Sequence, residues 1–277
     1  MKKAFIWIFY CLGLASTLIF RFFQVTSMTD KTTGFLLPQY KNTNYVTYAI
    51  CAVFILLLVL LGVFSDGLKR RRNKSVPIGI AAFLLGGTAT YAAVDRLGSL
   101  SVIGLIDLIY FISTAAFIIF LLYFAVCEIM GKRVAGASAV VPVIYAGVRL
   151  VTVFLQNFGL AKTVDVVVQT FMLVLSLIFW QYFGKYVADI KIKSTPRWLY
   201  GFALAASLLC MTSTIPTYYA TYVLKVPSVR EIGSDAYVDL AVGIFILVFV
   251  ICSLIGEKAN NRRSAGYDSD NEIGGDD

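Results

Sequence analysis

The 277-residue sequence is too apolar for a soluble protein: 59% of its residues are hydrophobic, 14% are charged and its mean hydropathy is +0.80. Soluble domains carry roughly 45–50% apolar and about 25% charged residues, and a chain of this length cannot bury the excess in its own core. The excess must face lipid. The formal charge of +8 does not indicate nucleic acid, because the basic residues flank apolar runs.

Eight runs have the roughly 20 apolar residues that a bilayer-spanning helix needs. We therefore predict an all-α polytopic membrane protein. The third run is the shortest, and Asp95, Arg96 and Gly98 after it are predicted to form a tight turn that makes a hairpin with the fourth. The predicted spans cover 4–24, 46–66, 77–94, 101–126, 137–157, 164–186, 198–220 and 236–256.

The basic residues predict the orientation of these spans, because lysine and arginine concentrate on the cytoplasmic side of a membrane. With the N-terminus inside, 16 of the 24 basic residues lie in cytoplasmic segments and two, Arg21 and Arg149, lie within spans. We expect a multi-pass protein of the cell membrane with both termini cytoplasmic. The outer segments hold the other six: Lys31, Lys41, Arg96, Lys162, Lys225 and Arg230.

The two ends of the chain differ in character. Lys2 and Lys3 followed by an apolar run also resemble a cleaved signal peptide, but the run continues through Phe20, longer than the usual ~7–15 residues, which favours a retained helix. The segment 258–277 is basic and then acidic and glycine-rich, a composition typical of disorder. We expect no soluble domain, because the connecting segments are short.

An internal repeat would divide the membrane part into halves of four helices, at 1–133 and 134–257. The loops before the third and seventh spans end alike, in Lys-Ser-Val-Pro at 74–77 and Lys-Ser-Thr-Pro at 193–196, and similar Ala-Ala, Leu-Leu and Thr-x-Thr patterns follow both. Parallel repeats of this kind occur in transporters. Chance matching among apolar sequences is the alternative, and superposition of the halves would decide between them.

Ionisable residues inside a membrane are costly and indicate function by default. Arg149 lies within the fifth span, and several polar residues fall at a comparable depth on the outer side of the other spans. We expect an outward-facing polar pocket for a small anionic solute, anchored by Arg149. The candidate binding residues are Arg149, Asp107, Gln169, Asp165, Gln156, Tyr218 and Asp239.

A structural interpretation of the same residues is open: Arg149 could be neutralised by Asp107 or Asp165 and hold helices in register. Arg21 is expected to extend its charged head to the interface. The aromatic residues near the inner boundary are typical of an interfacial belt. They are Trp180, Tyr182, Tyr186, Trp198 and Tyr200.

Enzyme chemistry has little support in the sequence. No histidine is present to activate a nucleophile, the five cysteines lack metal-binding spacing, and no nucleophile-elbow, zinc-protease or phosphate-loop motif occurs. We predict no catalytic residue, metal or cofactor. The leading hypothesis is a small-solute transporter or solute-binding permease-like protein; the alternatives are a non-catalytic sensor or assembly subunit with unknown protein partners, and a carboxylate-dependent intramembrane hydrolase.

Overall fold

The fold comes from a computed structural model that describes residues 2–30, 36–40, 42–68, 74–100, 104–156, 164–190, 194–225 and 234–272. The side chains of residues 2, 164, 165 and 257–272 lie outside this description. The described backbone is helical apart from short connections and one isolated bridge between Thr29 and Leu36.

Eight long helices are present in the described chain, one for each predicted span, and each is long and apolar enough to cross a membrane. Their ends lie within a few residues of most predicted boundaries. A 3₁₀ turn at Gly136–Val140 leads into the fifth, and a π-helical turn at Tyr219–Val223 follows the seventh. The helices are α1 (Lys2–Ser27), α2 (Thr43–Val63), α3 (Val76–Ser99), α4 (Leu105–Met130), α5 (Val141–Gln156), α6 (Val164–Val187), α7 (Thr195–Tyr218) and α8 (Asp235–Glu272).

Two boundaries differ from the sequence analysis. The predicted turn at 95–98 is wrong, because α3 continues to Ser99 and carries Arg96 in its last turn, where the guanidinium contacts carboxylates of neighbouring helices. At the other end of the chain, the backbone of α8 continues beyond the predicted span and is helical to Glu272, and the disorder expected over 258–277 stays a prediction. Extending an existing helix avoids the cost of nucleating a new one, so a polar segment can continue it.

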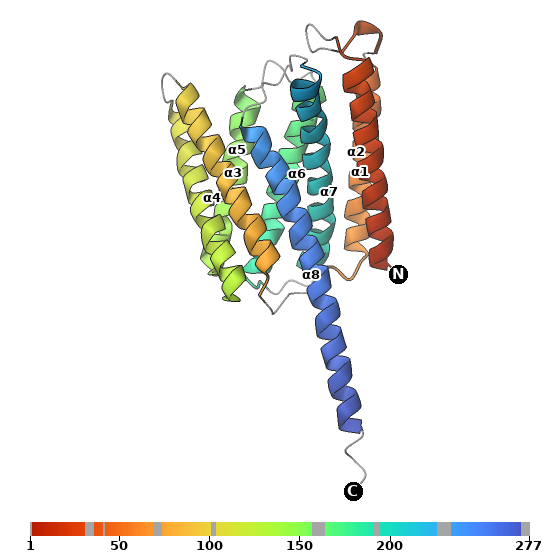
Figure 1. The fold of residues 1–277 in the computed structure, drawn as a ribbon, viewed down its shortest axis with the longest axis vertical. Helices are drawn as coiled ribbons and strands as arrows, with labels where there is room; N and C mark the ends of the chain where they lie inside the picture. The colour runs from red at the N-terminus through yellow and green to blue at the C-terminus, as the bar shows by residue number, and fades with distance from the viewer. Residues whose placement is uncertain are drawn as a thin grey trace.

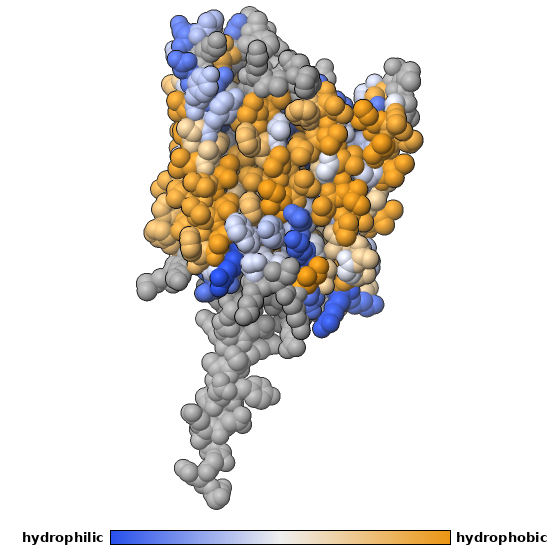
Figure 2. Space-filling view, turned by 180° about the vertical axis from the view of Figure 1, so that it is seen from behind, coloured by the Kyte–Doolittle hydropathy of each residue, from blue (hydrophilic) through white to orange (hydrophobic). Residues whose placement is uncertain are grey.

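The helices run alternately up and down, so that both termini lie at the same end of the bundle (Figure 1). Figure 2 shows a broad apolar band on the surface between two polar ends, as a bilayer requires. Large apolar side chains along the long helices, such as Ile19, Leu56 and Ile112, are exposed. The protein is therefore a multi-pass helical membrane protein.

Helix α7 is the centre of the bundle, with α1, α2, α6 and α8 as its main neighbours. The contact with α2 is made through glycines: a Cβ added to Gly62 would come within 2.4 Å of Gly201 Cα. Small residues let helix backbones approach closely in membranes, where packing drives association. Gly62 and Gly201 therefore fix the spacing of α2 and α7.

The packing is not equivalent in the two predicted halves. The repeat would make α3 the counterpart of α7, yet α3 packs mainly against α4 and α8, while α7 packs against four helices. These neighbours give the four-plus-four duplication no support, and it stays a prediction.

Candidate functional site

Arg149 forms a buried ion pair with Asp239. Its Nη2 lies 2.7 Å from Asp239 Oδ1 and also donates to the backbone oxygen of Asp235 at 3.0 Å. The two side chains are only 3% and 2% exposed. The expected neutralisation of Arg149 by Asp107 is therefore wrong, because Asp239 of α8 supplies the carboxylate and Asp107 pairs with Arg96.

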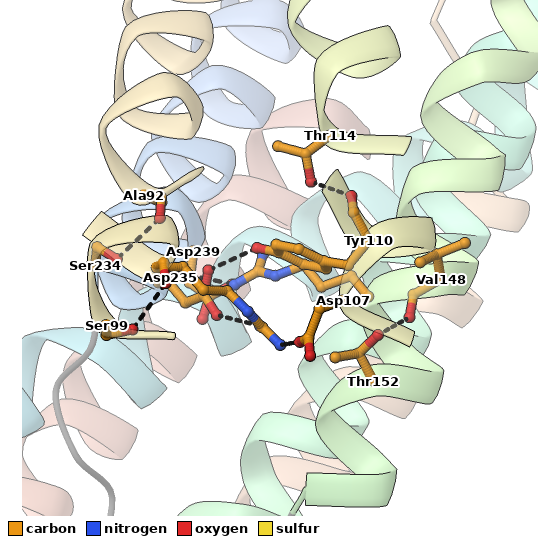
Figure 3. Close-up of polar contacts among 12 residues, drawn as sticks. Ala92, Ser99, Asp107, Tyr110, Thr114, Val148, Thr152, Ser234, Asp235 and Asp239 are labelled. Atoms are coloured by element: carbon orange, nitrogen blue, oxygen red, sulfur yellow. Dashed lines mark hydrogen bonds and ion pairs between the residues drawn. The ribbon is translucent and has the colours of Figure 1, made fainter. Parts of the chain in front are cut away.

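Asp107 instead pairs with Arg96, in the same group of side chains (Figure 3). Arg96 Nη2 donates to Asp107 Oδ1 at 3.0 Å, and Arg96 Nη1 lies 3.9 Å from Asp235 Oδ2. The guanidinium also stacks 4.2 Å from the ring centre of Tyr110, whose hydroxyl donates to Asp235 Oδ1 at 2.9 Å. We call Arg96, Asp107, Tyr110, Arg149, Asp235 and Asp239 the ion network.

The ion network lies at one end of the bundle, which we call the network end. It joins the last turn of α3, the first turns of α4 and α8 and the second half of α5. Three carboxylates face two guanidinium groups, so the group carries a formal charge of −1. Burial of an unpaired charge costs several kcal/mol or more, and the reciprocal pairing keeps these helices together.

The other predicted site residues do not join this network among the described contacts. Gln169 is buried on α6, Gln156 is exposed at the end of α5, and Tyr218 packs its ring against Tyr222 and Tyr237. The side chain of Asp165 lies outside the described residues. Arg149, Asp107 and Asp239 are thus the predicted residues that the structure brings into one group.

Sequence reasoning missed Arg96, Tyr110 and Asp235. Helical spacing could have found two of them, because residues three or four apart share a face: Tyr110 follows Asp107 by three residues and Asp235 precedes Asp239 by four. Arg96 was placed in a turn because the sequence shows no clear end for α3. Arg96 can reach the network only because α3 continues to Ser99, and contacts with other helices decide where α3 ends.

Aromatic side chains fill the bundle below the ion network. The ring of Tyr145, one turn before Arg149, stacks on Phe117 at a centroid distance of 4.1 Å. Phe117 contacts Trp180, which stacks on Phe245 at 5.6 Å. The prediction of a belt position for Trp180 is wrong, since the side chain is 1% exposed, and Tyr200 is fully buried as well. These rings separate the network from the other end of the bundle.

A cavity of about 370 Å³ opens at that opposite end, which we call the cavity end. It lies among the start of α3 and the ends of α4 and α6, with α8 on the remaining side. Apolar Ile78, Phe249 and the buried Ser253 form its inner wall. Charged residues at the mouth are Lys74, Glu128, Lys132, Arg133 and Asp189.

A second buried arginine lies between α1 and α2. Arg21 is 4% exposed and its Nη1 donates to Gln24 Oε1 at 2.5 Å, while Thr47 and Asn44 of α2 hydrogen-bond the same glutamine. The expectation that Arg21 reaches the interface is wrong, because its side chain is buried and donates to the side-chain oxygen of Gln24. This cluster holds α1 to α2 and is separate from the ion network.

The carboxylates of the ion network are all close to arginine. Each of the three lies within 3.9 Å of an arginine nitrogen. Among the described residues no group of three or more cysteine or acidic side chains is arranged to hold a metal.

The arrangement defines a class: a multi-pass helical membrane protein with a paired polar network at one end and an open cavity at the other. No family model, no curated protein and no solved structure matches this chain. The residues themselves must therefore carry any functional inference.

Proposed function

We propose that the protein is a small-solute transporter of the cell membrane that alternates between its two ends, and that the structure represents the state open at the cavity end. The observation that carries the proposal is the course of three helices. Each of α3, α4 and α8 bears one buried face that begins in the ion network and ends at the cavity.

On α3 this face runs from Arg96 through Ala89 and Leu85 to Ile78 in the cavity wall. On α8 it runs from Asp239 through Val242 and Ile246 to Phe249 and Ser253. The repeats of three and four residues keep each set on one side of its helix. α4 follows the same course in the residues Asp107, Tyr110, Phe117, Phe124 and Glu128.

A solute that enters the cavity meets the aromatic side chains and then the network, in line along the same helices. Alternating access in many transporters comes from rocking of one helix group against another around a fixed site. Here the salt bridges are the contacts that must separate to open the network end. Breaking them exchanges protein partners for water, which stabilises the charges once water enters.

The positive-inside distribution supports a cytoplasmic cavity end, because Lys74, Lys132 and Arg133 lie there. Both termini lie at the same end of the bundle (Figure 1). Protease accessibility of terminal epitope tags in intact cells and in inverted vesicles tests this orientation. Cleavage in intact cells would reverse it.

Reciprocal thiol accessibility tests alternation without knowledge of the solute. In a cysteine-free background, Val187→Cys places a thiol at the cavity and Ser113→Cys places one below the ion network, on α4. We expect a charged, membrane-impermeant thiol reagent to label Val187→Cys from the cavity end and to leave Ser113→Cys protected.

Addition of Arg96→Gln should weaken the closed network, expose Ser113→Cys and slow the labelling of Val187→Cys. Ile190→Cys is the matched control, because residue 190 is exposed at the same end and does not line the cavity. Its labelling should not change. If Arg96→Gln leaves both test positions unchanged in a folded protein, the two ends are not coupled and the proposal fails.

A further inference from the structure

The cavity carries more cations than carboxylates at its mouth. Lys74 precedes α3, and Lys132 and Arg133 follow α4, so three cationic side chains face the carboxylates of Glu128 and Asp189. These residues come from separate segments of the chain and converge only in the folded protein. Their convergence therefore needs an account beyond the flanking charge of any one helix.

Backbone contacts fix the positions of these cations. The N–H of Ser75, next to Lys74, donates to the Glu128 carbonyl at 3.0 Å, and the N–H of Lys132 donates to the Cys127 carbonyl at 2.8 Å. Gly131 between them has a φ of +72°, a left-handed conformation that suits glycine at a helix C-terminus. The start of α3 and the end of α4 are thereby held side by side at the mouth.

Lys74, Lys132 and Arg133 outnumber Glu128 and Asp189 at the mouth, so the cavity is suited to an anionic group with several acceptor oxygens. Ile78, in the first turn of α3, lines the cavity beside them.

We propose that the cavity binds a phosphate-bearing anion. This anion would be the substrate of the proposed transporter, so the inference rests on that proposed function. Its volume of about 370 Å³ lies within the ~300–1,000 Å³ of small-molecule sites. It accommodates a phosphate group against the cationic mouth and an organic part against Phe249 and Ile78. Two sources share this chemistry: a soluble phosphate ester, and the headgroup of an anionic phospholipid, which basic pockets at this membrane depth bind.

Thermal unfolding of the purified full-length protein in a neutral detergent tests the binding. The soluble probes are inorganic phosphate and glycerol 3-phosphate against chloride at equal ionic strength; the lipid probes are mixed micelles with phosphatidylglycerol or phosphatidylcholine. A bound anion should raise the melting temperature by about 2–4 °C per kcal/mol of binding linkage. Phosphate or ester acting alone indicates a soluble substrate, and phosphatidylglycerol acting alone indicates a headgroup; either supports the anion site.

The double variant Lys132→Gln, Arg133→Gln removes two cations from an exposed loop, and we expect roughly tenfold weaker apparent affinity. Lys185→Gln is the matched control: it lies one residue before the cavity-lining Tyr186 but points to Tyr182 instead. If the two cations only stabilised the fold, the double variant would have a lower melting temperature but would show the same rise on addition of the anion.

Protection of Val187→Cys from the thiol reagent by phosphate or by phosphatidylglycerol is a second measurement that needs no charge variant. The proposal is overturned if chloride stabilises as well as every phosphate-bearing probe, or if the double variant keeps the full shift. Loss of anion binding with intact reciprocal accessibility would refute this substrate chemistry and leave transport standing. Anion binding without coupled accessibility would refute transport and leave a binding site.

Discussion

The two ends of the bundle are built differently, although α3, α4 and α8 run through both. At the network end, cations and carboxylates are paired and the central pair is almost sealed, with Arg149 and Asp239 at 3% and 2% exposure. At the cavity end, the charged side chains of Lys132 and Arg133 are exposed around an open volume. The charged side chains thus bind one another at the network end, whereas those of the cavity end can contact a ligand.

The difference follows from what surrounds the charges. Within the apolar part of a membrane protein, a charge must be paired or it destabilises the fold. At the mouth of a cavity, water solvates the same groups, and their pairing contributes little to stability. We therefore expect substitutions at the two ends to differ in kind, with folding affected at one and binding at the other.

The largest effect is expected at the buried pair. Asp239→Ala leaves Arg149 without its carboxylate in a dry environment, at a cost of about 3–5 kcal/mol. The melting temperature and the yield of monodisperse protein should both fall strongly. The double variant Arg149→Met, Asp239→Leu should regain much of the loss, because no uncompensated charge remains. A stable Asp239→Ala protein would show that the network end is solvated and not closed.

The packing of α2 on α7, the central helix, is expected to be the next most sensitive feature. Gly62→Ala puts a methyl group 2.4 Å from Gly201 Cα, which forces the helices apart at a cost of about 1–3 kcal/mol. Gly87→Ala is the matched control, since nothing lies within 4 Å of its added Cβ. Equal melting temperatures for the two variants would contradict the close approach.

Arg96 lies nearer the surface of the network, at 11% exposure. Arg96→Gln should destabilise by less than Asp239→Ala, about 1–3 kcal/mol, because water can partly solvate Asp107 and Asp235. Thermal unfolding at low and high salt measures this difference. A loss as large as that of Asp239→Ala would mean that the whole network is as dry as its central pair.

The smallest effect on stability is expected at the cavity mouth. Lys132→Gln should change the free energy of unfolding by no more than about 0.5 kcal/mol, because the side chain is exposed. Comparison of its melting temperature with that of Arg96→Gln, in the absence of phosphate, provides the measurement. A large loss from Lys132→Gln would remove the contrast between the two ends.

Local pattern was enough to predict the membrane class and all eight helices, because hydropathy and helix length depend on the chain's own residues. It also singled out Arg149 and Asp239, since a charge inside an apolar run stands out without any structure. The pairing could not be predicted in this way. Arg149 had three carboxylates at similar depth, and which of them lies nearest depends on how α4, α5 and α8 pack.

The positions of Arg96 and Trp180 were predicted incorrectly for a related reason. Arg96 was assigned to a turn and Trp180 to the interface, because a sequence shows depth along a helix better than the direction a side chain faces. A pocket near Arg149 stays a prediction, and the cavity described here lies at the other end, among α3, α4, α6 and α8. Hydropathy along the chain is enough to assign the segments that enter the membrane. Packing between helices depends on contacts far apart in the chain, and it decides which charges are buried and where a cavity remains.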